Sequence, residues 1–393
     1  MKKKKLILFH GSFKTLDLFS SQLKSGFINL GYEILDFDLA DMVVSLGKLY
    51  QFMQDGPITA AIAFNCLVFG LKTPSGVNIW EQLQIPCINI LVDSPYWYHS
   101  LLMDSPNTSV ILCVDRNHMN YIQRFYPNIP MNGFLPHGGT AMKGLPTPIS
   151  QREISVLYAG SLFAKHVDSL KPNFSALDFP VEEICNKTIS DLISNPQYTV
   201  EAVLENNLKE QGIVMSDQDF RIFVTACAYI EHSANSYFRE RILSLIAKAG
   251  IPLKLYGDGW NQCDWFNLPN VDYGGVISPQ EVLEEMENTK IVLNTLPWFK
   301  DGSHERVFNG MLRGCLVFSA TSVYLNEILP DNTWESFSLI PEELSAIPER
   351  IINLLEDEAR AQEIANAGYQ LAMKEHTWQV RAEELHRDLL TYL

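Results

Sequence analysis

The chain has 393 residues, of which 47% are hydrophobic and 19% are charged, and its formal net charge is −16 at pH 7. This length and apolar fraction fit two domains with separate cores. A surface this acidic repels phosphate backbones and anionic lipid heads, which excludes nucleic acid as an expected partner.

The first part of the chain alternates strand-like and helix-like segments. Four lysines precede an apolar run of four residues that is too short for a signal peptide. Residues 5–9, which contain this run, are therefore interpreted as the first buried strand. Further strand-like runs follow at 32–37, 59–65, 87–92, 109–114 and 131–136. Repeated βα units predict a parallel sheet covered by helices, here an N-terminal Rossmann-like domain over 1–140.

A second series of strand-like runs begins near residue 154. Its members are 154–159, 252–256, 270–274, 290–294, 315–319 and 335–339. They predict a second doubly wound domain over 150–374, joined to the first by a Gly- and Pro-rich linker. Helical patterning over about 164–235 interrupts this domain and predicts an insertion, and 375–393 is expected to form a C-terminal helix. No stretch approaches the roughly 18 apolar residues of a membrane span.

Seven cysteines occur without a CxxC pair or a Cys/His cluster. Cys66, Cys87, Cys113 and Cys315 lie in or beside apolar runs, where cysteine acts as a small core residue. We therefore expect free thiols in a cytoplasmic protein, with neither disulfides nor a zinc site.

Ligands of open α/β sheets bind beyond the carboxyl ends of the strands, and the richest such segment here is 301–314. Ser303 is expected to cap a helix that ends near Gly314. Its predicted buried stripe comprises Val307, Phe308, Met311 and Leu312. Its opposite face would present Arg306, Asn309 and Arg313. Arginines beside a helix N-terminus suit a diphosphate, although an ordinary solvated face is the alternative.

This segment resembles the donor-binding segment of retaining GT-B glycosyltransferases of the group 1 type. In many of these an acidic residue, seven residues and a Glu precede a Gly-Pro-Val turn, whereas here Asp301 is followed by seven residues, Asn309 and then Gly314-Cys-Leu-Val. The HxRxFN pattern from His304 is closer to the spore-maturation-protein-like branch. The resemblance implies that Arg306 binds donor phosphate, that Asn309 contacts the ribose and that Asp301 acts near the transferred sugar.

Other strand ends of the second half support the resemblance, although each is also typical of an ordinary turn. Glycines follow the first two strands, and a Tyr-Gly-Gly sequence follows the third. With Arg306 and Asn309, the donor-binding residues implied in this half are Gly160, Ser161, Tyr256, Gly257, Gly259, Tyr273, Gly275, Ser303 and His304.

In the first half, the loop His10-Gly11-Ser12 ends the first strand, and the resemblance implies that it faces the cleft. His10 is the candidate general base if the reaction inverts configuration. If the reaction retains configuration, the leaving phosphate can accept the proton. A packing role for His10 is the alternative.

Three further residues follow first-half strands or lie at the hinge. Asp93 precedes aromatic residues and suits a catalytic or acceptor pocket, or else a helix cap. Asn65 is interpreted as a helix cap. His137 lies in the sequence His-Gly-Gly, which is interpreted as the hinge between the domains. The resemblance implies that this histidine lies near the donor sugar, and a linker residue is the alternative.

The resemblance implies the GT-B fold, with two Rossmann-like doubly wound domains facing a cleft, the first on the acceptor side, and a C-terminal helix that crosses back to the first. The implied function is sugar transfer from a nucleotide-diphosphate donor, a UDP-sugar, to a protein or glycan acceptor with retention. No cofactor or metal is expected, because no Asp-x-Asp loop is present.

There are three alternatives to this function. A non-catalytic GT-B accessory subunit stays open because Asn309 stands where the family has Glu. A sugar-nucleotide epimerase would show denser carboxylates at the first-half strand ends. A dinucleotide-dependent dehydrogenase would need GxGxxG after the first strand, which reads His-Gly-Ser-Phe-Lys.

Overall fold

The computed structural model describes residues 4–65, 68–163, 167–175, 177–295 and 298–393. The chain forms two compact units. The first comprises Met1–Thr140 and Met373–Leu393, and the second comprises Ala141–Ala372. Each unit is built on one six-stranded parallel sheet, which confirms the doubly wound α/β class expected from the sequence.

The first sheet has the strand order β2-β1-β3-β4-β5-β6. Its strands are β1 (Lys5–His10), β2 (Glu33–Asp38), β3 (Ala60–Phe64), β4 (Cys87–Leu91), β5 (Ser109–Cys113) and β6 (Met131–Phe134). The connecting helices are α1 (Lys14–Asn29), α2 (Met42–Gln54), α3 (Ile79–Leu83), η1 (Pro95–Tyr98), α4 (His99–Met103) and α5 (Arg116–Phe125). The central strands β3 and β4 are buried throughout, as expected for a sheet with helices on both faces.

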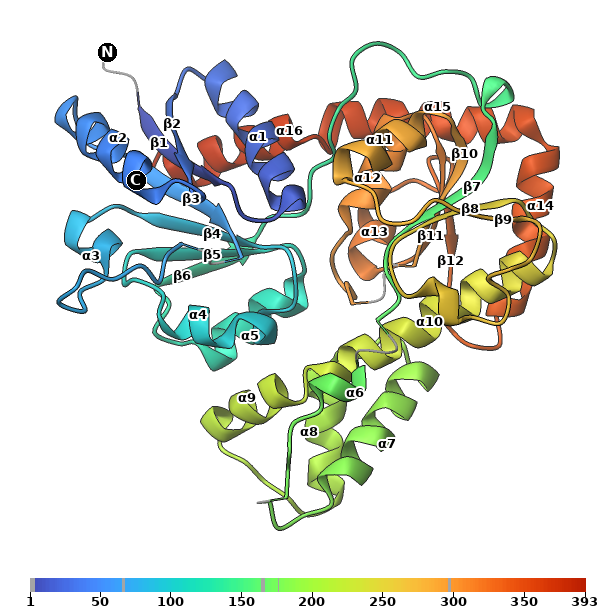
Figure 1. Cartoon of the computed structure of the whole chain (residues 1–393), viewed down its shortest axis with the longest axis horizontal. Coiled ribbons are helices and arrows are strands. Elements are labelled where there is room, and N and C mark those ends of the chain that lie inside the picture. Colours follow the sequence, from blue (N-terminus) through green and yellow to red (C-terminus); the bar gives the residue numbers. More distant parts are fainter. Residues whose placement is uncertain (1–3, 66–67, 164–166, 176, 296–297) are drawn as a thin grey trace. The chain divides into compact units, whose positions relative to one another are not determined.

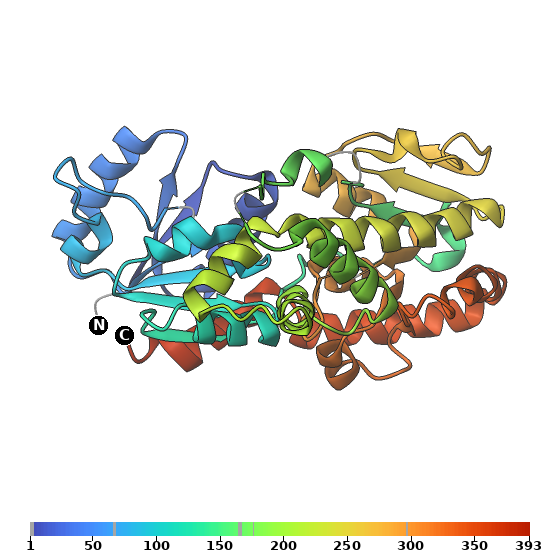
Figure 2. The ribbon, with the colours of Figure 1, turned by 90° about the horizontal axis from the view of Figure 1, so that it is seen from below.

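The C-terminal segment is part of the first unit. It continues α15 (Glu358–Glu375) with α16 (Trp378–Leu385) and a π-helical turn, η5 (His386–Leu390). The Trp378 ring packs 4.9 Å from that of Phe19 on α1, and the Gly139 amide donates to the His376 carbonyl at 2.7 Å. Figure 2 shows the last residues beside β1, where Lys4 Nζ donates to the Leu390 carbonyl at 2.9 Å.

The second sheet has the strand order β12-β11-β10-β7-β8-β9. Its strands are β7 (Ile154–Ala159), β8 (Leu253–Tyr256), β9 (Val271–Tyr273), β10 (Thr289–Asn294), β11 (Leu316–Ala320) and β12 (Glu335–Phe337). The other elements, apart from the insertion, are η2 (Ile149–Gln151), η3 (Trp260–Gln262), α11 (Pro279–Glu287), α12 (Glu305–Leu312), α13 (Val323–Ile328), η4 (Leu344–Ala346) and α14 (Ile347–Glu356).

A helical insertion separates β7 from β8 (Figure 1). It consists of α6 (Val167–Leu170), α7 (Val181–Ser194), α8 (Val200–Glu210), α9 (Asp217–Ala226) and the start of α10 (Tyr229–Lys248). The helix α10 is continuous from the insertion to the sheet (Figure 1). Near its middle, Glu240 accepts a hydrogen bond from Trp265 Nε1 at 3.0 Å, which anchors the helix beside β8.

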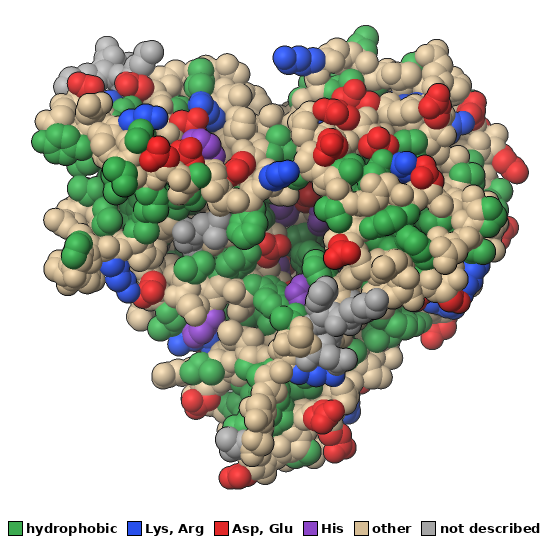
Figure 3. Space-filling view, in the orientation of Figure 1, with side chains coloured by type: hydrophobic (Ala, Val, Ile, Leu, Met, Phe, Trp, Pro, Cys, Tyr) green, Lys and Arg blue, Asp and Glu red, His purple; other side chains and the backbone are tan. Residues whose placement is uncertain are grey.

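Among the described side chains on the face drawn in Figure 3, acidic and basic groups are interspersed. The described cysteines are free thiols, whereas Cys66 lies outside the described residues. Within the described ranges, no helix combines the length and the apolar character needed to cross a membrane.

Candidate functional site

In the second unit the strand order reverses between β7 and β10, which lie side by side in the middle of the sheet. Such a switch point is where open α/β sheets bind ligands, beyond the carboxyl ends of the strands. Tyr158 on β7 is fully buried there, and its hydroxyl lies 3.4 Å from Thr295 Oγ1, just after β10. Tyr158, Asn294 and two arginines, Arg239 and Arg306, gather at this edge and are called the donor-side cluster.

The helix α12 begins at this edge, one residue later than the sequence predicted. Ser303 is not the capping residue; His304 is, because its Nδ1 accepts a hydrogen bond from the Arg306 amide at 3.1 Å. Burial, with help from the Arg306 and Arg239 charges, lowers the pKa of His304, while Glu305 opposes the shift. The same Nδ1 lies 2.8 Å from Glu305 Oε2, so the ring stands between the backbone of α12 and this carboxylate.

The prediction that α12 exposes a polar face was wrong. Every residue from Arg306 to Leu312 is buried, so the helix is enclosed on all sides. Arg313 also lies apart from the donor-side cluster, because it follows the last turn, where its Nε is 3.4 Å from a Glu287 carboxylate oxygen. One guanidinium of the predicted pair therefore remains at the helix start, with the Asn309 side chain one turn further along.

Arg306 is held by neighbours from two strands. Its Nη1 donates to Asn294 Oδ1 at 2.9 Å, and its guanidinium carbon lies 5.3 Å from the centre of the Tyr158 ring. Gly160 approaches the same guanidinium, since a Cβ on Gly160 would lie 3.4 Å from Arg306 Nη2. The side chain is thus fixed against the β7 end, as a phosphate-binding group requires.

A second buried arginine, which the sequence reasoning missed, comes from the middle of α10. Arg239 Nη1 donates to the Ser161 carbonyl at 2.7 Å, and its guanidinium carbon lies 5.0 Å from the Trp298 ring. Burial, reinforced by the nearby Arg306 charge, lowers the pKa of Arg239. The sequence signal was an arginine one turn before the apolar pair Ile242 and Leu243, within a helix that runs towards a strand.

Neither guanidinium has a carboxylate partner among the described residues. Arg306 is bound by an amide oxygen, and Arg239 by a backbone carbonyl, while Arg239 Nε is buried without a hydrogen-bond partner in the described part of the chain. Buried charges without counterions are costly, and they repel one another here. The donor-side cluster is therefore electrostatically complementary to an anion, with the α12 N-terminus adding to the positive potential.

The end of β8 packs against the end of β7 through glycines. A side chain on Gly257, whose φ is +117°, would collide with the Gly160 carbonyl oxygen. The Gly257 amide donates to the Gly275 carbonyl at 2.8 Å, and its own carbonyl accepts from the Tyr273 hydroxyl at 3.0 Å. The structure therefore brings Gly160, Gly257, Tyr273 and Gly275 together as one backbone-lined surface.

Ser161, Gly259 and Tyr256 are the remaining donor-side candidates at the ends of β7 and β8. Ser161 Oγ accepts from the Asp258 amide at 3.0 Å, directly before Gly259. The Tyr256 carbonyl accepts from the Gly160 amide at 3.0 Å, whereas its side chain interacts with Glu285 and Lys254.

Asp301 is half-buried in the segment that leads into α12. The backbone carbonyls of both neighbouring residues accept hydrogen bonds from the start of α13. The Gly302 carbonyl accepts from Ser322 Oγ at 2.7 Å, and the Lys300 carbonyl accepts from the Val323 amide at 3.0 Å. The backbone position of Asp301 is thus fixed from both sides.

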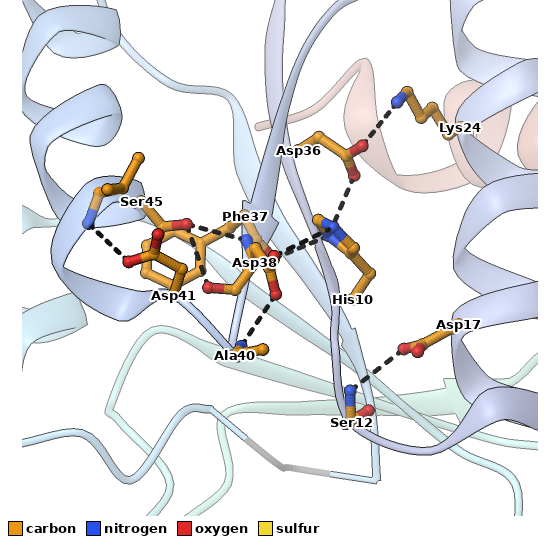
Figure 4. Close-up of polar contacts among 11 residues, drawn as sticks. His10, Ser12, Asp17, Lys24, Asp36, Phe37, Asp38, Ala40, Asp41 and Ser45 are labelled. Atoms are coloured by element: carbon orange, nitrogen blue, oxygen red, sulfur yellow. Dashed lines mark hydrogen bonds and ion pairs between the residues drawn. The ribbon is translucent and has the colours of Figure 1, made fainter.

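In the first unit, His10 ends β1 beside two carboxylates of β2 (Figure 4). Its Nδ1 lies 3.2 Å from the Phe37 carbonyl and 3.5 Å from Asp36 Oδ1. Because a carbonyl can only accept, this contact places the proton on Nδ1 and leaves Nε2 as the basic nitrogen. Asp38 Oδ2 lies 3.9 Å from Nε2.

The loop after His10 is tightly built. A side chain on Gly11, with φ at +84°, would collide with the Asp38 carboxylate, and the Ser12 amide donates to Asp17 Oδ1 at 3.3 Å. Glycine is therefore required at position 11 both for its backbone conformation and for its lack of a side chain.

Asp93 is bound by two residues of the same unit. Its Oδ2 accepts from Asn65 Nδ2 at 2.9 Å and from the Tyr98 hydroxyl at 2.7 Å. Asn65 therefore does not act as a helix cap; it ends β3 in the left-handed region, with φ at 54°, and its Oδ1 accepts from the Val92 amide at 3.0 Å. A non-glycine residue in this conformation is strained, and such strain clusters at functional sites.

His137 is buried in the first unit, with 2% of its surface exposed. Its ring centre lies 6.0 Å from that of Phe19, and its carbonyl accepts from Arg381 Nε at 3.2 Å. These contacts join the end of the first unit's sheet to its C-terminal helix. His10 and Asp93 follow strands that are separated by β3, at the same edge of the sheet.

Comparisons with known proteins agree with this architecture. Residues 239–387 match the family model described as glycosyl transferase-like. A sucrose-phosphate synthase from Thermosynechococcus elongatus is similar over 100% of both chains, with 13% identity and a TM-score of 0.56. The chain therefore has the GT-B fold, and residues 239–387 are glycosyl transferase-like.

An α-glucosyltransferase solved with UDP and a DNA 13-mer is also similar to this GT-B chain. The similarity covers 99% of this chain and 100% of that one, with 12% identity and a TM-score of 0.56. No curated protein matches the sequence. The family match begins at Arg239 and includes α12, so it contains both arginines of the donor-side cluster.

Proposed function

We propose that this chain is a glycosyltransferase that transfers a sugar from a UDP-sugar to a protein or glycan acceptor, with retention of configuration. The observation that carries the donor is the pair of buried guanidiniums, Arg239 and Arg306, neither of which forms an ion pair with a described carboxylate. A diphosphate supplies two negative charges and several acceptor oxygens, so it satisfies both arginines at once. The similar α-glucosyltransferase solved with UDP supports uracil as the base.

The donor would lie across the carboxyl ends of β7, β8 and β10. Arg306, Arg239 and the amides at the α12 start would hold the diphosphate, while Asn309 would contact the ribose. The backbone surface around Gly257 and Gly275 would receive the nucleoside. In this arrangement Asp301 lies near the transferred sugar, and no metal or other cofactor is needed because the arginines supply the positive charge.

The reaction exchanges one bond at the anomeric carbon for another. The bond from that carbon to the diphosphate oxygen breaks, and the diphosphate leaves with the electron pair. A bond forms from the carbon to an acceptor hydroxyl, whose proton passes to the leaving phosphate. The arginines lower the barrier because they face the charge that develops on the leaving group.

The acceptor would bind in the first unit near Asp93. Its carboxylate is oriented by Asn65 and Tyr98, and Trp97 follows it closely in sequence. A fixed carboxylate beside aromatic rings suits the hydroxyls and apolar faces of a sugar. Should the reaction invert configuration instead, His10 Nε2 would be the general base.

A thermal-shift screen with UDP, GDP, CMP, TDP, ADP and NAD tests the donor. We expect UDP to raise the Tm of the wild type, because a ligand that binds only the folded state stabilises it. Arg306→Ala and Arg239→Ala should each weaken UDP binding about 10- to 100-fold, since each removes a charge-assisted contact of roughly 1.5–3 kcal/mol. Addition of EDTA should leave the UDP shift unchanged.

Arg241→Ala is the matched control, because Arg241 lies on the same helix as Arg239 but is exposed. It should bind UDP as the wild type does. A shift with NAD alone, or equal UDP binding by all four proteins, would overturn the proposed donor site. A shift with another nucleotide that depends on both arginines would keep the site and correct the base.

A further inference from the structure

Two cysteines of the helical insertion lie in direct contact. Cys185, in the second turn of α7, and Cys227, the residue that ends α9, are both fully buried, and their Sγ atoms are 3.7 Å apart. A disulfide requires about 2.05 Å between the sulfurs, so a movement of less than 2 Å would join them. The residues are 42 positions apart in sequence, and the contact is therefore a product of the fold.

The surroundings favour chemistry at Cys185 over Cys227. The Cys227 thiol hydrogen-bonds to Cys185, and this contact, with the Tyr229 hydroxyl and Lys171 nearby, lowers the pKa of the Cys185 thiol against the opposing effect of burial. The same hydrogen bond and burial raise the pKa of Cys227. Since the thiolate is the reactive form, these directions favour Cys185 as the attacking thiol of the contacting pair and Cys227 as the resolving thiol.

The insertion has a surface cavity near the pair. A cavity of about 1070 Å³ opens beside α7 and the start of α10, and its lining includes Val181, Glu182 and Tyr229. Two residues of this lining, Glu182 and Tyr229, also act on the pKa of Cys185, and the Tyr229 ring centre lies 6.0 Å from Lys171 Nζ. The lining of the cavity is therefore adjacent to the buried pair.

We propose that Cys185 and Cys227 form a reversible dithiol–disulfide site that is oxidised by a hydroperoxide. The Cys185 thiolate attacks one peroxide oxygen, the O–O bond breaks, and the departing oxygen takes up the thiol proton as water, which leaves a sulfenic acid on Cys185. The Cys227 sulfur then attacks the Cys185 sulfur, the S–O bond breaks, and a second water leaves. Two thiols are oxidised to one disulfide while one hydroperoxide is reduced.

The disulfide would link α7 to the residue that precedes α10 by two positions. It would close a long loop within the insertion, which restricts the unfolded chain and raises the temperature at which the second unit unfolds. A small reductant such as dithiothreitol would reverse both changes.

Peptide mapping of the full chain after treatment with hydrogen peroxide tests the site without any substitution. We expect one linked pair of peptides, carrying Cys185 and Cys227, which dithiothreitol separates, and a higher Tm for the oxidised protein. Cys185→Ser and Cys227→Ser should lose the link and the Tm increase. Cys263→Ser, which removes a partly exposed thiol elsewhere in the unit, should retain both.

Mapping that shows both residues as unmodified thiols after peroxide treatment, or links formed by other cysteines in their place, would overturn the proposal. Oxidation of Cys185 to the sulfinic acid without a link to Cys227 would also overturn it. Neither the linked peptides nor the Tm change requires a nucleotide, so this result is independent of the donor site.

Discussion

Arg306 Nη1 donates to Asn294 Oδ1 at 2.9 Å, so an amide and not a carboxylate faces this buried guanidinium. The Asn294 Nδ2 atom in turn donates to Ser319 Oγ at 2.9 Å on the neighbouring strand, which fixes the amide orientation. The arginine is therefore oriented without being neutralised.

This relationship predicts opposite effects on stability and binding. Asn294→Asp would supply the missing counterion, so the folded protein should be as stable as the wild type or more so, while UDP binding should fall about 10-fold, because the carboxylate competes with the diphosphate and repels it. Thermal unfolding and UDP titration of the same samples measure both effects. Unchanged UDP affinity would show that Arg306 does not act through its free charge.

The predicted acceptor site can be separated from the donor site. Asp93→Asn keeps the shape of the side chain but removes its charge, so transfer should fall about 10- to 100-fold if the carboxylate binds an acceptor hydroxyl through a charge-assisted hydrogen bond. Release of UDP in the presence of an acceptor found by a glycan and peptide screen measures transfer. The variant should show the same UDP thermal shift as the wild type. If the variant lost this shift, Asp93 would act on the donor and not on the acceptor.

The backbone conformation of Asn65 predicts that two small substitutions at this position differ in stability. Asn65→Gly and Asn65→Ala both remove the hydrogen bonds to Asp93 and Val92, but only glycine accepts a φ of 54° without strain. Asn65→Ala should therefore be less stable than Asn65→Gly by roughly 1 kcal/mol. Urea unfolding of the two variants provides the measurement, and equal midpoints would contradict the strain.

The lowered pKa of His376 predicts that the first unit becomes less stable as the pH falls. Burial, aided by the Arg381 charge, lowers the pKa of His376 to about 3, and its Nδ1 accepts from Arg381 Nη2 at 3.1 Å. The unfolded chain, with a histidine pKa near 6.5, binds this proton first as the pH falls. The contribution of neutral His376 to the free energy of unfolding is therefore complete above about pH 6.5 and is lost progressively towards pH 3. The loss is about 2 kcal/mol between pH 7.5 and pH 5.

Urea unfolding at these two pH values, compared between the wild type and His376→Gln, checks this prediction. Glutamine cannot take up the proton, so the variant should lose about 2 kcal/mol less than the wild type over the same interval. An identical pH dependence for the two proteins would show that His376 is not the group responsible.

The strands and the general position of α12 were predictable because they depend on local patterns. Apolar runs of four to six residues between glycines and helical segments mark buried parallel strands, and the sequence gives them within one or two residues of β1 to β12. The helix cap was misplaced by one residue because serine is the commoner capping residue, whereas here the imidazole of His304 takes that role.

The second arginine of the donor-side cluster was not predictable by the same means. Arg239 is separated from Ser161 by 78 positions, most of them in the insertion, and only the packing of α10 on the sheet brings them together. The exposed face assigned to α12 was wrong for a related reason. Helical periodicity identifies one buried face but does not show whether a second element covers the other.

The continuity of α10 bears on how this protein could be shortened or rebuilt. One helix of 20 residues, about 30 Å long, begins within the insertion and carries Arg239 at its midpoint. The insertion is therefore not a detachable module, because any excision that cut into α10 would remove part of the helix that positions Arg239. A trimmed protein would have to be rejoined before Tyr229, with a new cap supplied for the helix that remains.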